Sequence, residues 1–302
     1  MSERIIEVTD LRKSYGDVDA VKGISFDVHR GEVFAMLGPN GAGKTTTTEI
    51  LEGYRARSGG TVTVLGHGPV KRERALKERM GIVLQSTGID PFLTVTETIE
   101  MYAGYYPSRR PTGEVIEVVG LAEKKDTRVN KLSGGQQRRL DVAIALAGDP
   151  ELLFLDEPTT GFDPSARRNA WEVVKNLVTI GKTVFLTTHF MDEAQYLADR
   201  VVVIADGLIV AEGPPASLAG RDHMRTRIRF RLPEGVQAPD GDARRLPDGS
   251  LEIDVDAAAA TKVLHDLTGW ALDDGVTLES LEISQPTLED VYLQLTGAEV
   301  GT

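Results

Sequence analysis

The residues with the clearest chemical meaning form a glycine-rich stretch near the start of the chain. Gly38-Pro39-Asn40-Gly41-Ala42-Gly43-Lys44-Thr45 fits the pattern G-x-x-x-x-G-K-[ST] and lies between a strand candidate and a helix candidate. Glycines let successive backbone N–H groups turn toward phosphate oxygens, and the start of the helix adds a positive dipole. Lys44 would reach the β- and γ-phosphates, and the Thr45 hydroxyl would bind Mg²⁺. The stretch therefore predicts a site for the phosphate groups of a nucleotide.

Two acids at the end of an apolar run form a second candidate site. Leu152–Leu155 is a buried-strand pattern, and Asp156 and Glu157 follow it directly. A carboxylate at the end of such a strand can point at the Mg²⁺ held by the phosphate loop. Adjacent strand residues face opposite ways, so we assign Asp156 to the metal and Glu157 to the attacking water. The alternative is a strand that merely ends in solvated acids, and the phosphate loop disfavours it.

A third candidate is the segment Leu132-Ser133-Gly134-Gly135-Gln136, just before a predicted helix over 134–147. Its exposed amides at a helix N-terminus could bind a second anion. On spacing alone, an ordinary helix cap with a glycine turn explains the same residues better, because Ser133 and Gln136 are spaced as a capping box.

The elements that must position these residues alternate over roughly the first 220 residues, which is typical of a parallel α/β sheet. The predicted strands are Ile5–Val8, Val33–Leu37, Met80–Leu84, Leu152–Leu155, Thr183–Thr187 and Arg200–Ile204. Predicted helices follow the glycine-rich turn at 38–43 and cover 95–106, 112–120, 134–147, 164–180 and 191–198. Thr94 with Glu97 predicts a capping box, and Asp163 before Pro164 predicts an N-cap followed by a first helical residue.

The pattern changes near 212–221, where Glu212-Gly213-Pro214-Pro215 is turn chemistry. We expect one domain over 1–220 and a small α+β appendage over 221–302. Within the appendage the expected strands are Arg225–Leu232, Leu251–Val255 and Val276–Ile283, and the expected helices are Ala257–Leu267 and Pro286–Leu295.

The amino-acid composition excludes several classes of function. The chain has 302 residues, a formal net charge of −12 and no cysteine. Without cysteine there can be no disulfide framework, thiol nucleophile or iron–sulfur cluster. The acidic balance argues against a broad nucleic-acid-binding surface, so no nucleic-acid partner is expected. No run approaches the roughly 18 apolar residues of a membrane span, so any membrane role is expected to come through a partner.

Taken together, the motifs resemble a known family. GPNGAGKT at 38–45, LSGGQ at 132–136, LLFLDEP at 152–158 and His189 occur in the order seen in ATP-binding-cassette (ABC) ATPases, and LSGGQ is that family's own signature. The resemblance covers roughly the first 220 residues. It implies a P-loop NTPase core of ABC type with an inserted helical subdomain at about 86–149. It also implies a head-to-tail dimer, in which ATP lies between one subunit's phosphate loop and the other's Ser133–Gln136.

The resemblance implies roles for single residues. Tyr15 matches the aromatic residue that stacks on adenine, and Gln85 matches the glutamine that meets Mg²⁺ or water. Asp163 matches the aspartate that links the two sites across the dimer, although Phe162 stands where the family more often has Leu or Ala. His189 matches the histidine that contacts the γ-phosphate. The implied nucleotide-binding set is Tyr15, Gly38, Pro39, Asn40, Gly41, Ala42, Gly43, Lys44, Thr45, Thr46, Ser133, Gly134, Gly135, Gln136 and Asp163. The implied catalytic set is Lys44, Gln85, Glu157 and His189, and the implied Mg²⁺ set is Thr45, Gln85 and Asp156.

The C-terminal part points to a subfamily. Gln285–Leu293 and Leu51-Glu52-Gly53-Tyr54 resemble the daunorubicin-exporter group of drug-resistance ATPases. The resemblance implies an ATPase that energises export of a drug-like or other hydrophobic compound through a separate integral membrane permease, at the cytoplasmic face of the cell membrane. A final amphipathic helix explains the same C-terminal residues. The alternatives are an ABC ATPase acting in DNA repair or translation, a non-hydrolysing ATP-dependent scaffold, and a transporter of another cargo such as a lipid-linked glycan.

Overall fold

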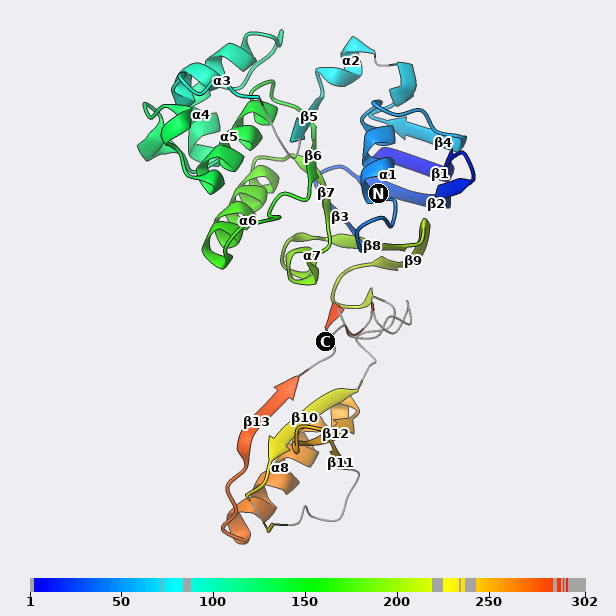
Figure 1. The fold of residues 1–302 in the computed structure, drawn as a ribbon, viewed down its shortest axis with the longest axis vertical. Coiled ribbons are helices and arrows are strands. Elements are labelled where there is room, and N and C mark those ends of the chain that lie inside the picture. Colours follow the sequence, from blue (N-terminus) through cyan, green and yellow to red (C-terminus); the bar gives the residue numbers. More distant parts are fainter. Residues whose placement is uncertain are drawn as a thin grey trace. The chain divides into compact units, whose positions relative to one another are not determined.

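The computed structural model describes residues 3–71, 73–83, 88–218, 225–233, 235–236, 243–284, 287–288, 290 and 292. The chain divides into two compact units, Met1–Pro215 and Ala216–Thr302. Figure 1 shows the elements of both units.

A six-stranded sheet forms the centre of the first unit, with strand order β5-β6-β7-β3-β8-β9. Five of its strands are parallel, and β9 pairs antiparallel with β8. The strand bounds are β5 (Met80–Val83), β6 (Leu152–Asp156), β7 (Thr183–Thr188), β3 (Val33–Leu37), β8 (Arg200–Ala205) and β9 (Leu208–Gly213). Strand β3 is a continuous apolar run, whereas β7 also contains Thr183, Thr187 and Thr188; both are buried at every residue, as expected for a parallel sheet covered on both faces. This confirms the predicted parallel α/β core.

A second sheet packs beside the first, with strand order β2-β1-β4. Its strands are β1 (Arg4–Tyr15), β2 (Val18–His29) and β4 (Gly59–Val64), all antiparallel. Inward-facing residues of this sheet, such as Ile6 and Phe26, share one core with Phe34, Phe154 and Phe185 of the six-stranded sheet. The three phenylalanine rings are in contact, with Phe34 and Phe185 centroids 5.7 Å apart. Helix α1 (Lys44–Leu51) adds Ile50 and Leu51 to the same core, which fixes the phosphate loop against both sheets.

Helices surround the six-stranded sheet, and α3, α4 and α5 gather on one side of it (Figure 1). The helix bounds are α2 (Arg74–Lys77), α3 (Val95–Ala103), α4 (Thr112–Val118), α5 (Gly134–Leu146), α6 (Pro164–Thr179) and α7 (Met191–Leu197). Short 3-10 turns lie at Pro69–Lys71, Ala122–Lys124 and Val129–Lys131. The structure confirms the capping boxes at Thr94 and Ser133 and the N-cap at Asp163.

In the described residues of the second unit, an antiparallel sheet packs on a helix. The strand order is β11-β12-β10-β13, formed by β10 (Thr226–Arg231), β11 (Arg244–Arg245), β12 (Leu251–Val255) and β13 (Glu279–Ser284). Helix α8 (Ala257–Asp273) contributes Leu267 to a core with Ile228 and Phe230.

Two predicted boundaries in this unit are wrong, and one predicted element is largely undescribed. The strand expected from Val276 begins at Glu279, because residues 274–278 form the turn that follows α8. The helix expected to end at Leu267 continues to Asp273, since Ala271 also packs into the core. The last helix, expected over Pro286–Leu295, lies mostly outside the described residues. Among the described helices, none is long and apolar enough to span a bilayer.

Candidate active site

The phosphate loop connects β3 to α1, and its glycines have distinct structural roles. Gly41 and Gly43 adopt φ values of 83° and 106°, which side chains with a Cβ rarely adopt. A Cβ on Gly38 would lie 2.3 Å from the backbone oxygen of Ile204. The loop lines a pocket of about 130 Å³ together with Lys44, Thr45, Thr46 and Glu157. The structure thus brings the predicted phosphate-binding residues together at the carboxyl end of β3, where α/β sheets bind ligands.

Lys44 lies at the centre of this pocket and is only 4% exposed. Its ammonium group donates to the carbonyl oxygens of Gly38, at 2.7 Å, and Pro39, at 3.1 Å. It also lies 3.2 Å from Oε1 of Glu157. The cation is therefore held by oxygen atoms inside the phosphate loop, and phosphate oxygens entering the pocket would meet it directly.

Glu157 follows β6 but has left the strand, with a φ of 44°. Its N–H contacts the carbonyl and the hydroxyl of Thr187, each at 3.1 Å, and its Oε2 accepts from Thr160 Oγ1 at 3.1 Å. Burial raises the pKa of Glu157, but the hydrogen bond and charge of Lys44, together with the contacts of Thr160 and His189, leave the pKa below its ordinary value. Glu157 is therefore an ionised carboxylate that can accept a proton from water. The strained backbone, rather than strand alternation alone, separates its direction from that of Asp156.

Asp156 ends β6 two strands away from the phosphate loop, with β7 between. Its Oδ1 accepts from Thr187 Oγ1. Thr45, at the start of α1, lines the same pocket as Lys44 and Glu157, and α1 packs against β6. A carboxylate and a hydroxyl are the oxygen donors that Mg²⁺ prefers, so this donor set fits that ion.

Another carboxyl group lies near Asp156. Glu52 follows the last residue of α1. Burial raises the pKa of Glu52 to about 8, and the negative charges of Asp156 and Glu49 contribute to the increase. The end of α1 therefore carries an acid that is largely protonated at neutral pH.

His189 follows β7 and lies beside Glu157. Its Nδ1 is 3.3 Å from Oε2 of Glu157, within ion-pair distance but poorly aligned for a hydrogen bond. Its ring packs on Phe190, with centroids 4.0 Å apart. The structure thus places Lys44, Glu157 and His189, three of the predicted catalytic residues, in one cluster. The fourth, Gln85, lies outside the described residues.

Tyr15 ends β1 at the turn into β2 and is 41% exposed. Two cations lie over its ring, with Lys13 Nζ 4.8 Å and Arg55 Cζ 5.2 Å from the centroid. Strand β2 approaches the phosphate loop closely, because a Cβ on Gly43 would lie 2.7 Å from the backbone oxygen of Ala20. The strand pair β1–β2 thus presents an accessible aromatic ring on the element that borders the phosphate loop.

The signature segment lies in a different groove from the phosphate loop. Ser133 caps α5, accepting from Gln136 N at 3.3 Å, while Gln136 Oε1 accepts from Ser133 N at 2.9 Å. Ser133–Gln136 and Asp163 line a groove of about 510 Å³ that has no lining residue in common with the phosphate-loop pocket. Asp163 Oδ1 accepts from the N–H groups of Ser165 and Ala166, both at 2.9 Å. Within one chain, therefore, the two predicted nucleotide-contacting surfaces line different hollows, and a third cleft touches both, at Gly134 and at Glu157.

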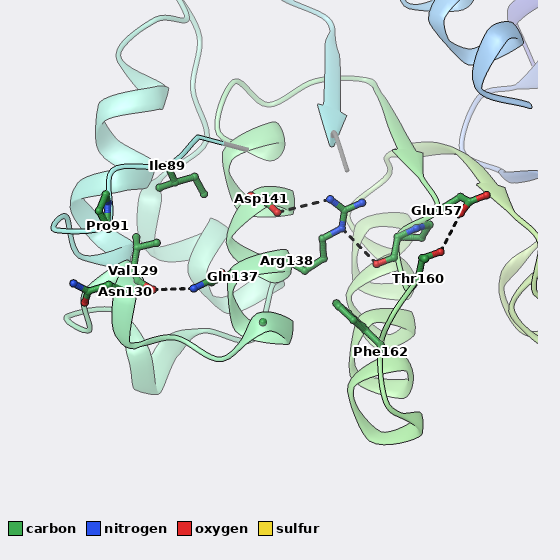
Figure 2. A pocket seen from close by; sticks show the side chains of 12 residues that line it. Ile89, Pro91, Val129, Asn130, Gln137, Arg138, Asp141, Glu157, Thr160 and Phe162 are labelled. Carbon is green, nitrogen blue, oxygen red and sulfur yellow. Dashed lines mark hydrogen bonds and ion pairs between the residues drawn. The ribbon is translucent and has the colours of Figure 1, made fainter. Parts of the chain in front are cut away.

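A larger cleft of about 800 Å³ lies between α5 and the loop after β6, and Figure 2 shows the side chains that line it. Glu157 and Thr160 border it on one side, and Val129 and Asn130 on the other (Figure 2). Arg138 crosses from α5 and donates to the carbonyl oxygens of Asp156, at 3.1 Å, and Pro158, at 3.4 Å. Sequence reasoning missed Arg138, because an arginine in a helix usually faces solvent. It connects the helix capped by Ser133 to the loop that carries Glu157.

The fold and the site define a class of protein. The phosphate loop connects a strand of a parallel sheet to a helix, and a nearby strand of the same sheet ends in acidic residues. This arrangement is that of a phosphate-loop nucleoside triphosphatase. The ABC transporter family model matches residues 21–160, and a model of the C-terminal domain of ABC transporter domain-containing proteins matches residues 226–287.

Individual relatives agree with this class. The Nod factor export ATP-binding protein I of Paraburkholderia xenovorans (strain LB400) is 39% identical, and the match covers 99% of each chain. The linearmycin resistance ATP-binding protein LnrL of Bacillus subtilis (strain 168) is 35% identical over 97% of this chain and 98% of its own. The chain belongs to the ABC transporter family, as an ATP-binding cassette that hydrolyses ATP.

Solved structures match the first part of the fold. The cassette cbiO1 of Clostridium perfringens, part of the ABC transporter complex cbiONQ, matches with a TM-score of 0.63 and 30% identity over 71% of this chain and 90% of its own. A dimeric post-hydrolysis structure of the cassette MJ0796, bound to ADP and Pi, matches with a TM-score of 0.60 and 25% identity over 69% of this chain and 98% of its own.

Proposed function

We propose that this chain is the ATP-hydrolysing subunit of an exporter and energises the passage of a drug-like or other hydrophobic compound through a separate membrane permease. The observation that carries the proposal is similarity over nearly the whole chain, including the second unit, to ATP-binding proteins for Nod factor export and linearmycin resistance. The clustered Lys44, Glu157 and His189 support the chemistry.

The proposed reaction is in-line attack of water on the γ-phosphorus of ATP. The phosphate-loop amides and Lys44 bind the phosphate oxygens and stabilise the charge that develops on them. Glu157, ionised and 3.3 Å from His189, orients the water and accepts its proton. His189 contacts the γ-phosphate, Tyr15 stacks on adenine, and Gln85 completes the site.

Mg²⁺ fits the oxygen donors beside the phosphate loop. Thr45 and Asp156 would hold the ion, with Gln85 or water as a further ligand. When bound, the ion would neutralise charge on the phosphates. The hydrogen bond from Thr187 to Asp156 would keep that carboxylate oriented.

A second copy of the chain is the proposed partner at the nucleotide. The signature groove and the phosphate-loop pocket share no lining residue within one chain, and in the proposed arrangement ATP contacts both because two chains meet head to tail. The dimeric MJ0796 cassette supports this arrangement. ATP binding would close the dimer, and hydrolysis would reopen it.

The permease is proposed to dock beside α3, which would place the chain at the cytoplasmic face of the cell membrane. Phe92, Met101 and Tyr105 expose 68%, 42% and 74% of their area there. Large apolar side chains gathered on one surface often mark a protein interface. This surface belongs to the same group of helices as α5, the helix that Ser133 caps. A partner docked there could therefore respond when the dimer closes.

Purification of the tagged chain from membranes of its own cells tests the permease. We expect an integral membrane protein to copurify and to be lost from the Phe92→Asp/Tyr105→Asp variant. Val70→Asp, which changes a 48% exposed apolar residue elsewhere, is the matched control and should retain it. A complex made only of soluble proteins would contradict the transport role while leaving the ATPase assignment intact.

A further inference from the structure

One buried carboxyl group beside the active site has no role in the chemistry described above. Glu193 lies on α7, four residues after His189, and its side chain is completely buried. Its Oε1 accepts two hydrogen bonds, from Thr159 Oγ1 at 2.8 Å and from Trp171 Nε1 at 3.0 Å. Its Oε2 is buried without a hydrogen-bond partner among the described residues. An acid is rarely buried so completely, because burying a carboxyl group costs free energy unless hydrogen bonds or an ion pair offset that cost.

The two hydrogen-bond donors come from the elements on which the site depends. Thr159, 1% exposed, is two residues after Glu157. The next residue, Thr160, donates to the Glu157 carboxylate. Trp171 is buried on α6, the helix that Asp163 caps. Glu193 therefore joins the loop that carries Glu157, the helix that follows Asp163 and the helix that follows His189.

Burial determines the charge of this group. It raises the pKa of Glu193 above the ordinary value, and the polar groups of Thr188, Thr159 and Trp171 offset only part of the increase. In its protonated form, a carboxyl group resembles an amide in shape and in having both a hydrogen-bond donor and an acceptor. Glutamine can keep the acceptor that faces Thr159 and Trp171, whereas leucine of similar size removes it.

We propose that Glu193 is a positioning residue for ATP hydrolysis: it ties α7 to Thr159 and Trp171 and so fixes Glu157 relative to His189. The inference rests on the proposed roles of Glu157 and His189. It assigns Glu193 no contact with ATP, so its effect should fall on turnover rather than on nucleotide affinity.

Steady-state ATPase kinetics and equilibrium ATP binding test this assignment. For Glu193→Leu we expect kcat to fall at least about 10-fold, while the Kd for ATP changes less than about 3-fold, because a misplaced base and histidine slow only the reaction. Glu193→Gln should recover most of the lost kcat. Glu172→Leu and Glu172→Gln are the matched controls on an exposed residue beside Trp171, and both should turn over at the wild-type rate.

A second pair of variants tests the same hydrogen bonds by changing the donors instead of Glu193. Thr159→Val removes one donor with little change in shape, and Trp171→Phe removes the other and also leaves a smaller ring; each should lower kcat by about 2- to 10-fold, in line with the loss of one buried hydrogen bond. These variants also keep the proposal testable if Glu193→Leu does not fold. Wild-type kcat in both variants would overturn it, and so would a loss in Glu193→Leu that falls equally on Kd.

Non-additivity gives a readout that general destabilisation would not produce. In a Glu157→Gln background, Glu193→Leu should lower the residual rate less than about 3-fold, because the group it positions is already disabled. A full 10-fold further loss would overturn the proposal. Absence of ATPase activity in the wild-type chain would instead contradict the proposed function, so the two failures are distinguishable.

Discussion

The ammonium group of Lys44 lies 3.2 Å from the carboxylate of Glu157, so the cation expected to bind phosphate also contacts the acid expected to activate water. The contact joins two segments that are far apart in sequence, the start of α1 and the end of β6. It also helps to keep Glu157 ionised: burial raises the pKa of Glu157, but the hydrogen bond and charge of Lys44, together with Thr160 and His189, leave that pKa below its ordinary value. We expect changes at these two residues to give different phenotypes.

Glu157→Gln should separate ATP binding from hydrolysis. The amide keeps the size of the side chain but cannot accept a proton from water, so kcat should fall by about 100-fold or more. ATP affinity should be retained, and the ATP-bound dimer should accumulate. Phosphate release, equilibrium binding and size-exclusion chromatography with magnesium-ATP measure the three properties. Turnover at the wild-type rate would refute the assignment, as would a variant that stays monomeric with ATP.

Lys44→Ala should lose ATP binding. It removes the buried cation from the phosphate pocket and leaves Glu157 without its partner, so affinity should fall by at least about 10-fold, or 1.4 kcal/mol. Lys125→Ala, which changes an exposed lysine away from the pocket, is the control. Titration with a fluorescent ATP analogue measures both. Equal affinities for the two variants would mean that Lys44 does not contact phosphate.

Ser133 and Thr94 offer a matched pair for testing the signature segment. Both side chains complete capping boxes at helix N-termini. Ser133→Ala and Thr94→Ala should therefore each cost about 1 kcal/mol of stability. Only Ser133→Ala should also reduce ATPase activity and ATP-driven dimerisation. Thermal unfolding and ATPase rates compare the two, and equal activity would favour an ordinary cap at Ser133.

Glu151 should make stability depend on acid pH. Hydrogen bonds and charge from Arg79 and Arg30 lower the pKa of Glu151 to about 2, against an ordinary value of 4.5. The stabilisation is present above pH 4.5 and is lost as the pH falls through about 2. Glu151→Gln should lower the unfolding temperature at pH 7, and the difference from wild type should shrink at pH 3. A difference that does not depend on pH would contradict this account.

Local patterns predicted most of the first unit. Apolar runs bounded by turns marked the strands of the six-stranded sheet, and the caps at Thr94, Ser133 and Asp163 marked three helix starts. Strands β2, β4 and β9 were not predicted from the sequence. Strand β2 has a mixed segment near its start, Asp19-Ala20-Val21-Lys22, and only its second half buries alternate apolar residues, Ile24, Phe26 and Val28; it pairs with β1. Sheet context decides such strands more than intrinsic preference does.

The phosphate loop could be predicted because its residues are consecutive in the sequence and their pattern alone indicates phosphate binding. Arg138 and Glu193 were missed for the opposite reason. Each is an ionisable residue on a helix, where such residues usually face solvent, but elements distant in sequence bury Glu193 and half-bury Arg138. Their positions depend on how α5, α6 and α7 pack around the end of β6. A short stretch of sequence holds no information on that packing.

The separation of the signature groove from the phosphate-loop pocket has a consequence for mixtures of defective subunits. A Lys44 variant keeps an intact Ser133 surface, and a Ser133 variant keeps an intact Lys44 pocket. If both variants are made in one cell, they can form a mixed head-to-tail dimer. One nucleotide site of that dimer would combine the intact Lys44 pocket with the intact Ser133 surface, and the other site would combine the two altered ones. Two alleles that are inactive alone would then complement each other in part.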